Sequence, residues 1–307
     1  MAEGSNVTES RGKMPLQSKG HHARTLTAEE LKKLEKDTNL VSDFKQNKLE
    51  KEAQKNWDLF YKRNSTNFYK DRHWTTREFE ELITDSNSSQ KILLEVGCGV
   101  GNFLFPLLEE SPGLFIHACD FSPRAVQFVK DNPNYDSGRI NAFRCDLTVD
   151  PLTDSIADRN ADIVTMIFVL SAIHPKKMEN AIKNVSTVLK PGGVVLFRDY
   201  GLYDHAMLRF STGHKLGDNF YVRQDGTRAY YFSEEILGDL FKSCGFDIDI
   251  NEYVLRETVN KKEGLCVPRV FIQGKFVKRK ELPSSTNDHC LSSDMDSDKK
   301  LTDHHTS

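Results

Sequence analysis

Short β-rich runs alternate with helical segments between residues 91 and 200, and no other feature of the sequence constrains the fold as strongly. Helical patterns near Phe103, Arg124 and Met178 separate the β-rich runs. Alternation of this kind is typical of βαβ units, which build a mostly parallel sheet covered by helices on both faces. The predicted strands of this α/β core are Ile92–Val96, Leu114–Cys119, Ile140–Cys145, Ile163–Leu170 and Val194–Arg198.

The N-terminal side of this core carries a helical extension. Thr27 and Glu30 form a capping-box pattern that opens a helix. Apolar residues from Leu40 onward recur at helical spacing, which predicts one long amphipathic helix ending near Tyr61. A short helix is predicted at Thr76–Ile83, and a polar break separates it from the core.

The C-terminal side carries a helix and a hairpin. Ser233 is placed to cap a helix that ends at Lys242. Two further strands, Phe246–Leu255 and Val267–Phe276, predict an antiparallel hairpin joined by a charged loop. The two ends of the chain are polar and poor in apolar anchors. Four parts are predicted: a disordered tail at 1–24, a helical extension at 25–90, an α/β domain at 91–280 and a disordered acidic tail at 281–307.

Composition excludes several classes of protein. The chain has 307 residues, 38% hydrophobic side chains and a net charge of -3, which fits a folded protein without a uniformly basic surface. No apolar run is long enough for a membrane span, and the first residues lack an apolar leader, so we expect no membrane association and a cytoplasmic chain, with a nuclear pool left open. Six cysteines without a C-x-x-C pair predict reduced thiols and no metal site.

A glycine-rich turn follows the first predicted core strand. The run Leu93–Asn102 reads LLEVGCGVGN, and glycines such as Gly97 and Gly99 let the backbone turn tightly beside a ligand. A dinucleotide site requires a third glycine where Asn102 stands, so the G-x-G-x-G spacing favours S-adenosylmethionine over NAD. A purely structural turn remains the alternative for this motif taken alone.

Acidic residues follow the next two strands. Asp120 ends the second strand, where an acid accepts hydrogen bonds from both ribose hydroxyls of a nucleoside cofactor. Asp146 ends the third strand and could accept a hydrogen bond from an adenine amino group, while Leu147 packs on the ring. A role for Asp146 as a helix N-cap is an equally good explanation of its position.

Several longer motifs resemble one known family. The segment Val188–Leu196 (VLKPGGVVL) resembles the corresponding helix end and strand of class I methyltransferases. Four further motifs resemble the tRNA N3-methylcytidine methyltransferases: WDLFYKRN at 57–64, FYKDRHW at 68–74, FRDYGLYDHAM at 197–207 and YVRQDGTR at 221–228. The resemblance implies a Rossmann-like class I fold: a mostly parallel seven-stranded sheet with a terminal antiparallel hairpin and an N-terminal helical extension.

The same resemblance implies a function. The family methylates N3 of a cytidine in the tRNA anticodon loop with S-adenosylmethionine, serine tRNA being the usual substrate of the nearest relatives, which work with seryl-tRNA synthetase. We therefore expect tRNA and the synthetase as partners of a chain that is monomeric by itself. The N-terminal helix would fold over the cofactor, although Trp57 could equally be a core anchor of an amphipathic helix. The implied cofactor-binding residues are Trp57, Tyr61, Gly97, Gly99, Asp120, Asp146, Leu147 and Ile167.

Basic and aromatic residues are interleaved after the predicted long helix. Between residues 62 and 77 there are five Lys or Arg residues against one acid, a mixture that holds phosphates and stacks an unpaired base. We expect Arg63, Phe68, Arg72 and Trp74 to contact the RNA. A second basic cluster between residues 256 and 280 could follow the anticodon stem. The alternatives are a solvated loop and a charged hairpin surface.

The end of the fifth core strand provides the catalytic candidate. Asp199 lies where parallel sheets place ligands, and its negative charge would stabilise a base that becomes cationic on methylation. Tyr200 and His205 are weaker substrate-binding candidates, and Asp199 could instead pair with Arg198 or a backbone amide. Two other functions stay open from the residues alone: methylation of a protein or small molecule, and a non-catalytic cofactor-binding scaffold for a tRNA–synthetase complex.

Overall fold

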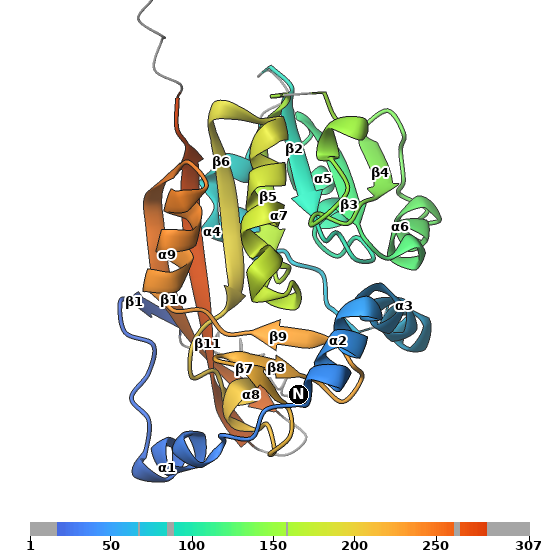
Figure 1. Ribbon diagram of the computed structural model, residues 1–307. Coiled ribbons are helices and arrows are strands. Elements are labelled where there is room, and N and C mark those ends of the chain that lie inside the picture. The colour runs from blue at the N-terminus through green and yellow to red at the C-terminus, as the bar shows by residue number, and fades with distance from the viewer. Residues whose placement is uncertain (1–16, 67, 85–88, 158, 261–264, 281–307) are drawn as a thin grey trace, which may run out of the picture.

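The computed structural model describes residues 17–66, 68–84, 89–157, 159–260 and 265–280 (Figure 1). An eight-stranded sheet with the order β1-β10-β11-β6-β5-β2-β3-β4 forms its centre. The five strands from β6 to β4 are parallel, and the other three run antiparallel to their neighbours. Their bounds are β1 Gln17–Gly20, β2 Lys91–Val96, β3 Leu114–Asp120, β4 Ile140–Arg144, β5 Ala161–Ile167, β6 Leu189–Tyr200, β10 Phe246–Asn260 and β11 Leu265–Lys278.

The predicted parallel sheet with a terminal hairpin is confirmed, but all seven predicted strands differ from their expected bounds by at least one residue. Strand β5 ends at Ile167 instead of Leu170, because Phe168 adopts a positive φ of 59° and turns the chain out of the sheet. Strand β6 begins at Leu189, earlier than expected. The carboxyl ends of β2, β3, β5 and β6 lie along one edge of the sheet, and a loop follows each of them.

Strand β1 corrects two predictions. It pairs antiparallel with β10, from Gln17 opposite Arg256 to Gly20 opposite Tyr253, so the sheet has eight strands and not seven. The expected disorder of residues 1–24 is therefore wrong for residues 17–24, while residues 1–16 and the predicted tail at 281–307 lie outside the described residues. The physical reason is that β1 contributes backbone hydrogen bonds to a sheet edge, which polar residues supply as well as apolar ones.

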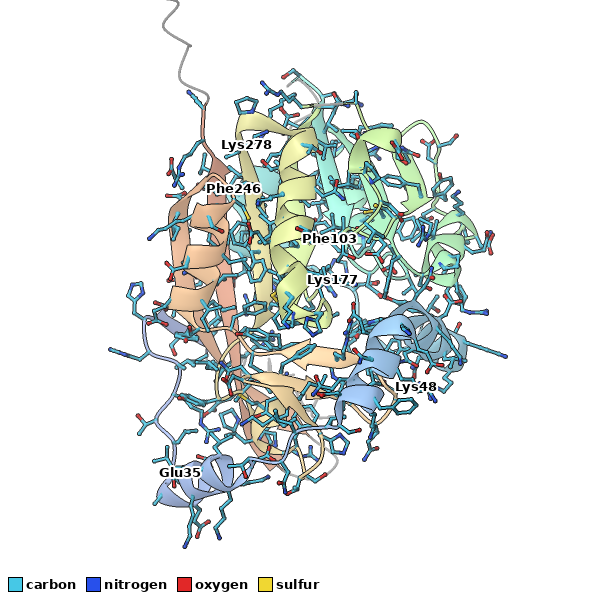
Figure 2. The ribbon with its side chains drawn as sticks, in the orientation of Figure 1. Glu35, Lys48, Phe103, Lys177, Phe246 and Lys278 are labelled. Carbon is cyan, nitrogen blue, oxygen red and sulfur yellow. The ribbon has the colours of Figure 1, made fainter. Side chains whose placement is uncertain are left out.

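Helices cover both faces of the sheet, as the alternation predicts. One core packs α7 (Pro175–Val188) and α9 (Glu234–Ser243) against the sheet, and the other packs α5 (Leu104–Glu110) and α6 (Pro123–Lys130). Phe246, at the start of β10, and Phe103, just before α5, belong to these two cores (Figure 2). No helix within the described ranges is long and apolar enough to cross a membrane.

The N-terminal extension is built from several short helices. The capping box of Thr27 and Glu30 opens α1 (Ala28–Lys36) as predicted. The single long helix expected up to Tyr61 is wrong, because the chain breaks at Glu52 into α2 (Asp43–Lys51) and α3 (Ala53–Asn64). The predicted helix at Thr76–Ile83 is divided into α4 (Thr75–Glu78) and the 3-10 turn η1 (Glu80–Leu82).

The insert between β6 and α9 forms a second, small sheet. It contains α8 (His205–Leu208) and the antiparallel strands β7 (Lys215–Gly217), β8 (Phe220–Val222) and β9 (Arg228–Tyr230). Figure 1 shows this small sheet next to α2, below the ends of the parallel strands. The insert and helix α2 of the extension therefore lie next to each other beyond the carboxyl ends of the parallel strands.

Candidate active site

The glycine turn at the end of β2 forms the floor of the site. Gly97 and Gly99 have positive φ values of 63° and 55°, which side chains rarely tolerate. A Cβ atom on Gly97 would lie 2.5 Å from Cγ2 of Val169. The two glycines therefore serve a close backbone approach, and the third, Gly101, turns the chain toward α5.

Asp120, at the end of β3, ties the glycine turn to the next strand. Its Oδ2 accepts a hydrogen bond from the Gly99 amide at 3.0 Å, and its Oδ1 accepts one from the Ser122 amide at 2.9 Å. Burial raises the pKa of Asp120 to about 6, although both amides oppose the shift. Each carboxylate oxygen has a second lone pair, so Asp120 can still accept hydrogen bonds from a ligand.

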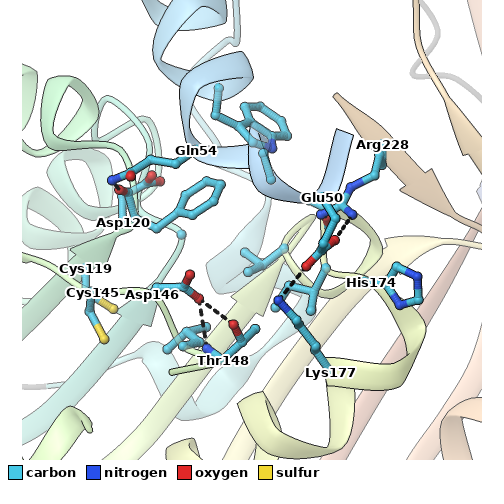
Figure 3. A pocket seen from close by; sticks show the side chains of 18 of the residues that line it. Glu50, Gln54, Cys119, Asp120, Cys145, Asp146, Thr148, His174, Lys177 and Arg228 are labelled. Atoms are coloured by element: carbon cyan, nitrogen blue, oxygen red, sulfur yellow. Dashed lines mark hydrogen bonds and ion pairs between the residues drawn. The ribbon is translucent and has the colours of Figure 1, made fainter. Parts of the chain in front are cut away.

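A cavity of about 240 Å³ begins at Asp120 and extends past the ends of β4 and β5 (Figure 3). Asp146 and Leu147 line it, as predicted for an adenine site. The Oδ1 atom of Asp146 also accepts hydrogen bonds from the amide and hydroxyl of Thr148, at 2.9 and 2.8 Å. Asp146 therefore closes a local turn and lines the cavity at the same time, so the two explanations of this residue are compatible.

Helix α3 covers this cavity from the other side. Trp57 and Tyr61 line it, and Tyr61 is buried with its hydroxyl 3.2 Å from the position that a Cβ atom on Gly99 would take. The Gln54 side chain donates to the Phe121 carbonyl at 2.6 Å, and the Ser122 hydroxyl donates to Asp58. Trp57 therefore lines the cavity, and this position favours contact with a ligand over a role as a core anchor.

An ion-pair cluster that the sequence did not reveal closes the far end of the cavity. Glu50 of α2 lies 2.5 Å from the Lys177 Nζ atom of α7 and also pairs with Arg228 of β9 (Figure 3). Burial by itself would raise the pKa of Glu50, but the hydrogen bonds and charges of Lys177 and Arg228 lower it further, so the pKa lies below its usual value. These three side chains join the extension, the core and the insert, and no local sequence pattern reports such a contact.

A second, smaller cavity adjoins the glycine turn. Glu95, Tyr69, Arg72, Ile167 and Phe168 are among its lining residues. The Oε2 atom of Glu95 is buried without a hydrogen-bond partner among the described residues. Burial raises the pKa of Glu95 to about 8, with Arg72 opposing the shift and Asp120 adding to it. A buried carboxylate oxygen of this kind requires a donor, which a cationic ligand group would supply.

The predicted RNA-contacting residues do not all meet at these cavities. Arg72 lines the second cavity and donates to the Ile167 carbonyl at 3.3 Å, whereas Arg63 and Phe68 are exposed on the surface of the extension. Tyr200 packs against Phe168 with ring centroids 5.1 Å apart. Arg72 and Tyr200 are therefore brought together at the site, and Arg63 and Phe68 lie outside it.

Trp74 and His205 have other neighbours. The buried guanidinium of Arg198 lies 4.7 Å from the Trp74 ring, so Trp74 anchors the extension to the sheet, and its contact with the RNA stays a prediction. His205 opens α8, and its charged neighbours are Asp204, Arg209, Arg269 and Arg24. His205 is not among the described residues lining either cavity, and its contact with substrate stays a prediction.

Asp199 is completely buried at the end of β6. Its Oδ2 accepts a hydrogen bond from the Ser171 amide and its Oδ1 one from the Tyr200 amide, both at 2.9 Å. Burial raises its pKa to about 6, against these hydrogen bonds. Asp199 does not line either cavity among the described residues, so it holds the backbone of Tyr200 and Ser171 in place and acts as a positioning residue.

These residues fit S-adenosylmethionine. Asp120 and Asp146 offer acceptors for ribose hydroxyls and an adenine amino group in the first cavity, and the unpartnered oxygen of Glu95 suits the ammonium of the methionine portion in the second. Gly97, which lines both cavities, leaves room for a ligand to pass between them. The sheet order together with this site defines an S-adenosylmethionine-dependent class I methyltransferase.

Comparisons with known proteins identify the family. A methyltransferase domain family matches residues 94–195. The human tRNA N(3)-cytidine methyltransferase METTL6 is 64% identical over 271 residues, which cover 88% of this chain and 95% of that protein. The tRNA N(3)-methylcytidine methyltransferase trm141 of Schizosaccharomyces pombe is 44% identical over 241 residues, or 78% and 97% of the two chains. The chain belongs to the tRNA N(3)-cytidine methyltransferase family.

Solved structures support the fold alone. A methyltransferase from Anabaena variabilis, described as SAM-dependent, matches with a TM-score of 0.55 and 17% identity, and the match covers 74% of this chain and 95% of that one. A similar protein from Methanosarcina mazei matches with a TM-score of 0.50 and 19% identity, over 69% of this chain and all of that one. Both agree with the class I methyltransferase fold described above.

The raised pKa of Glu95 gives the site a testable pH dependence. Below pH 8 the free protein holds Glu95 largely neutral, whereas the ammonium of S-adenosylhomocysteine favours the ionised form. Binding should therefore release a proton, and affinity should rise by up to about tenfold per pH unit between pH 6.5 and 8. Calorimetry in buffers of different ionisation enthalpy measures this release. Glu95→Gln should bind S-adenosylhomocysteine more weakly and should not release the proton that Glu95 loses on binding. Equal proton release by both proteins would contradict the assignment.

Proposed function

We propose that this chain methylates N3 of a cytidine in the anticodon loop of serine tRNA and works together with seryl-tRNA synthetase. Membership of the tRNA N(3)-cytidine methyltransferase family supports the reaction. The observation that carries the proposal is the group of aromatic and guanidinium side chains beside the glycine turn: Tyr69, Arg72, Phe168 and Tyr200. Such a group suits a flat unpaired base, and loops of tRNA can present such a base at low cost.

Methyl transfer to N3 depends on the alignment of the reacting atoms more than on proton transfer. S-adenosylmethionine supplies an activated methyl group, and N3 of cytosine has a free lone pair at neutral pH. The protein must hold N3 in line with the methyl group and balance the positive charge that the base acquires. Asp199 fixes the Tyr200 backbone at this edge of the sheet, and the carboxylate of Glu95 lies at the second cavity.

Cationic strand residues support binding of a nucleic acid. Arg256 of β10 lies directly opposite Arg269 of β11, an arrangement that destabilises a sheet unless an anion compensates it. Asp204 pairs with Arg269 at 2.8 Å, and phosphates of an anticodon stem would offset the remaining repulsion. Exposed Lys62 and Arg63 at the end of α3 add positive charge on the side of the extension.

The proposals of serine tRNA as substrate and of the synthetase as partner rest on the resemblance of the motifs at 57–64, 68–74, 197–207 and 221–228. Gly226, in the last motif, has a φ of 84°, and its carbonyl accepts a hydrogen bond from Asn56 just before the first motif. This hydrogen bond holds the motif at 221–228 next to the start of α3.

The proposal is tested with purified protein, labelled S-adenosylmethionine and serine tRNA, with and without seryl-tRNA synthetase. We expect 3-methylcytidine by nucleoside mass spectrometry, more of it when the synthetase is present, and none in a tRNA whose target cytidine is replaced by uridine. Binding to tRNA should weaken steeply between low and moderate salt. Cofactor binding without methylated cytidine in any arm would overturn the proposal, and equal yields without the synthetase would remove the partner from it.

A further inference from the structure

Phe168, the first residue after β5, has an unusual backbone conformation. Its φ of 59° is a genuine outlier for a bulky side chain, and such a conformation costs on the order of 1–3 kcal/mol. Glycine or asparagine would adopt this conformation more easily. The amide of Phe168 still donates to the Arg198 carbonyl at 2.7 Å, so the turn begins while the chain is bonded to β6. A strained residue with a large ring at the end of a central strand indicates that the ring itself is needed there.

The Phe168 ring has neighbours that fix its orientation. Its centroid lies 5.1 Å from that of Tyr200 and 5.6 Å from that of Phe271. The Arg72 guanidinium lies 5.5 Å from the ring centroid and is itself held by the Ile167 carbonyl. Aromatic neighbours and a cation of this kind limit the rotamers of the ring, so Phe168 is a preorganised surface and not a mobile side chain.

Phe168 also lies between the two cavities. It lines both of them, as do Trp57, Tyr61 and Gly97, and it is only half-buried. The other three belong to the glycine turn and the helix that covers it, whereas Phe168 belongs to the opposite wall, at the carboxyl end of β5. In an open parallel sheet, ligands bind at this edge. Phe168 is thus the aromatic residue that joins the cofactor site to the cluster of Arg72 and Tyr200.

We propose that Phe168 is the stacking platform that holds the target base for methylation, with the Arg72 guanidinium beside it as a hydrogen-bond donor to the base carbonyl. The inference rests on the proposed function, because it assigns the residue that positions the cytosine. Stacking on an aromatic ring accepts any flat base, and the Arg72 donors would favour a pyrimidine carbonyl.

Such a platform favours the transition state over the bound substrate. The N3 lone pair forms the new bond to the methyl carbon while the electron pair of the sulfur–carbon bond remains on sulfur, so the base gains one positive charge. The face of a phenylalanine ring attracts a cation more strongly than a neutral ring. Phe168 should therefore lower the barrier as well as bind the base, because only interactions that strengthen in the transition state accelerate the reaction.

The test compares substitutions that keep or remove the ring. Phe168→Tyr keeps an aromatic face, and Phe168→Leu keeps apolar volume but has no aromatic face. Phe168→Asn relieves the backbone strain and removes both the aromatic face and the apolar volume. We expect Tyr to retain turnover of serine tRNA within about threefold and Leu and Asn to lose about ten- to a hundredfold. Turnover is compared at saturating cofactor, and the affinity for S-adenosylhomocysteine, whose cavity Phe168 also lines, should fall by less than turnover does. Phe115→Leu, at the amino end of β3, is the matched control and should behave like wild type.

A second readout does not depend on turnover. A fluorescent cytosine analogue at the target position of the tRNA should be quenched by wild type and by Phe168→Tyr, and should stay bright with Phe168→Leu. Wild-type turnover and quenching in Phe168→Leu would overturn the platform while leaving the proposed function intact. Absence of 3-methylcytidine with the wild-type protein would instead overturn the proposed function, and quenching would then show whether the base still stacks on Phe168.

Discussion

Asp120→Asn should weaken S-adenosylhomocysteine binding by about a hundred- to a thousandfold, because it replaces a charged acceptor that holds the glycine turn. The two carboxylate oxygens of Asp120 accept the amides of Gly99 and Ser122. An asparagine has one acceptor oxygen and an NH₂ group that would face a second donor. The turn would lose one of its two hydrogen bonds, and the ligand would lose a carboxylate acceptor. Titration calorimetry measures the change.

The same carboxyl group predicts a pH dependence of cofactor binding. Because burial raises the pKa of Asp120 to about 6, protonation should remove the charged acceptor as the pH falls through 6. Wild-type affinity should therefore decrease below pH 6, and Asp120→Asn should lack this decrease. Asp247→Asn changes an exposed acid that pairs with Arg279 and is the matched control. An affinity of Asp120→Asn within threefold of wild type would contradict this role.

Asp199→Asn should reduce methyl transfer at saturating cofactor by about a hundredfold while leaving S-adenosylhomocysteine affinity within about threefold of wild type. Asp199 accepts the amides of Ser171 and Tyr200 and lies outside the lining of both cavities among the described residues. The asparagine amide would repel one of these backbone donors and shift Tyr200, which packs on Phe168. The substitution also removes a negative charge near a base that becomes cationic.

A pH profile separates the positioning role of Asp199 from its charge. Because its pKa is raised to about 6, turnover at saturating cofactor should fall below pH 6 if the ionised form is required. Asp199→Asn should then show a low turnover that no longer changes in this range. Thermal unfolding of the variant controls for lost stability, since the residue is fully buried. Wild-type turnover in Asp199→Asn would remove the residue from the mechanism.

Several features of the fold and site follow from local patterns. The alternation of strands and helices predicts the parallel sheet, and the Thr27–Glu30 capping box predicts where α1 begins. The glycine turn and the acids Asp120 and Asp146 follow consecutive strands, and parallel strands bring their carboxyl ends to one edge. Once the order of the strands can be predicted, side chains that are far apart in the sequence can therefore be predicted to lie close together.

Other features depend on contacts between distant segments, which no periodicity reports. The short strand β1 has no apolar pattern, because an edge strand is held by its backbone and needs no apolar side chains. The break at Glu52 leaves no signal in the sequence, because the apolar spacing continues across it. Packing turns α2 so that Glu50 meets Lys177 and Arg228.

The sequence alone therefore determined the parallel strands and the glycine turn, because both depend on local propensity and on the fixed geometry of parallel strands. The cofactor followed from the glycine spacing and the family resemblance. Only the tertiary structure decided which aromatic and basic residues meet at the site. Trp74 and Phe168 are both aromatic residues beside an arginine, yet one contacts buried Arg198 and the other lines both cavities. That difference arises from packing between the extension, the sheet and the insert, since the type of a side chain does not specify the direction in which it points.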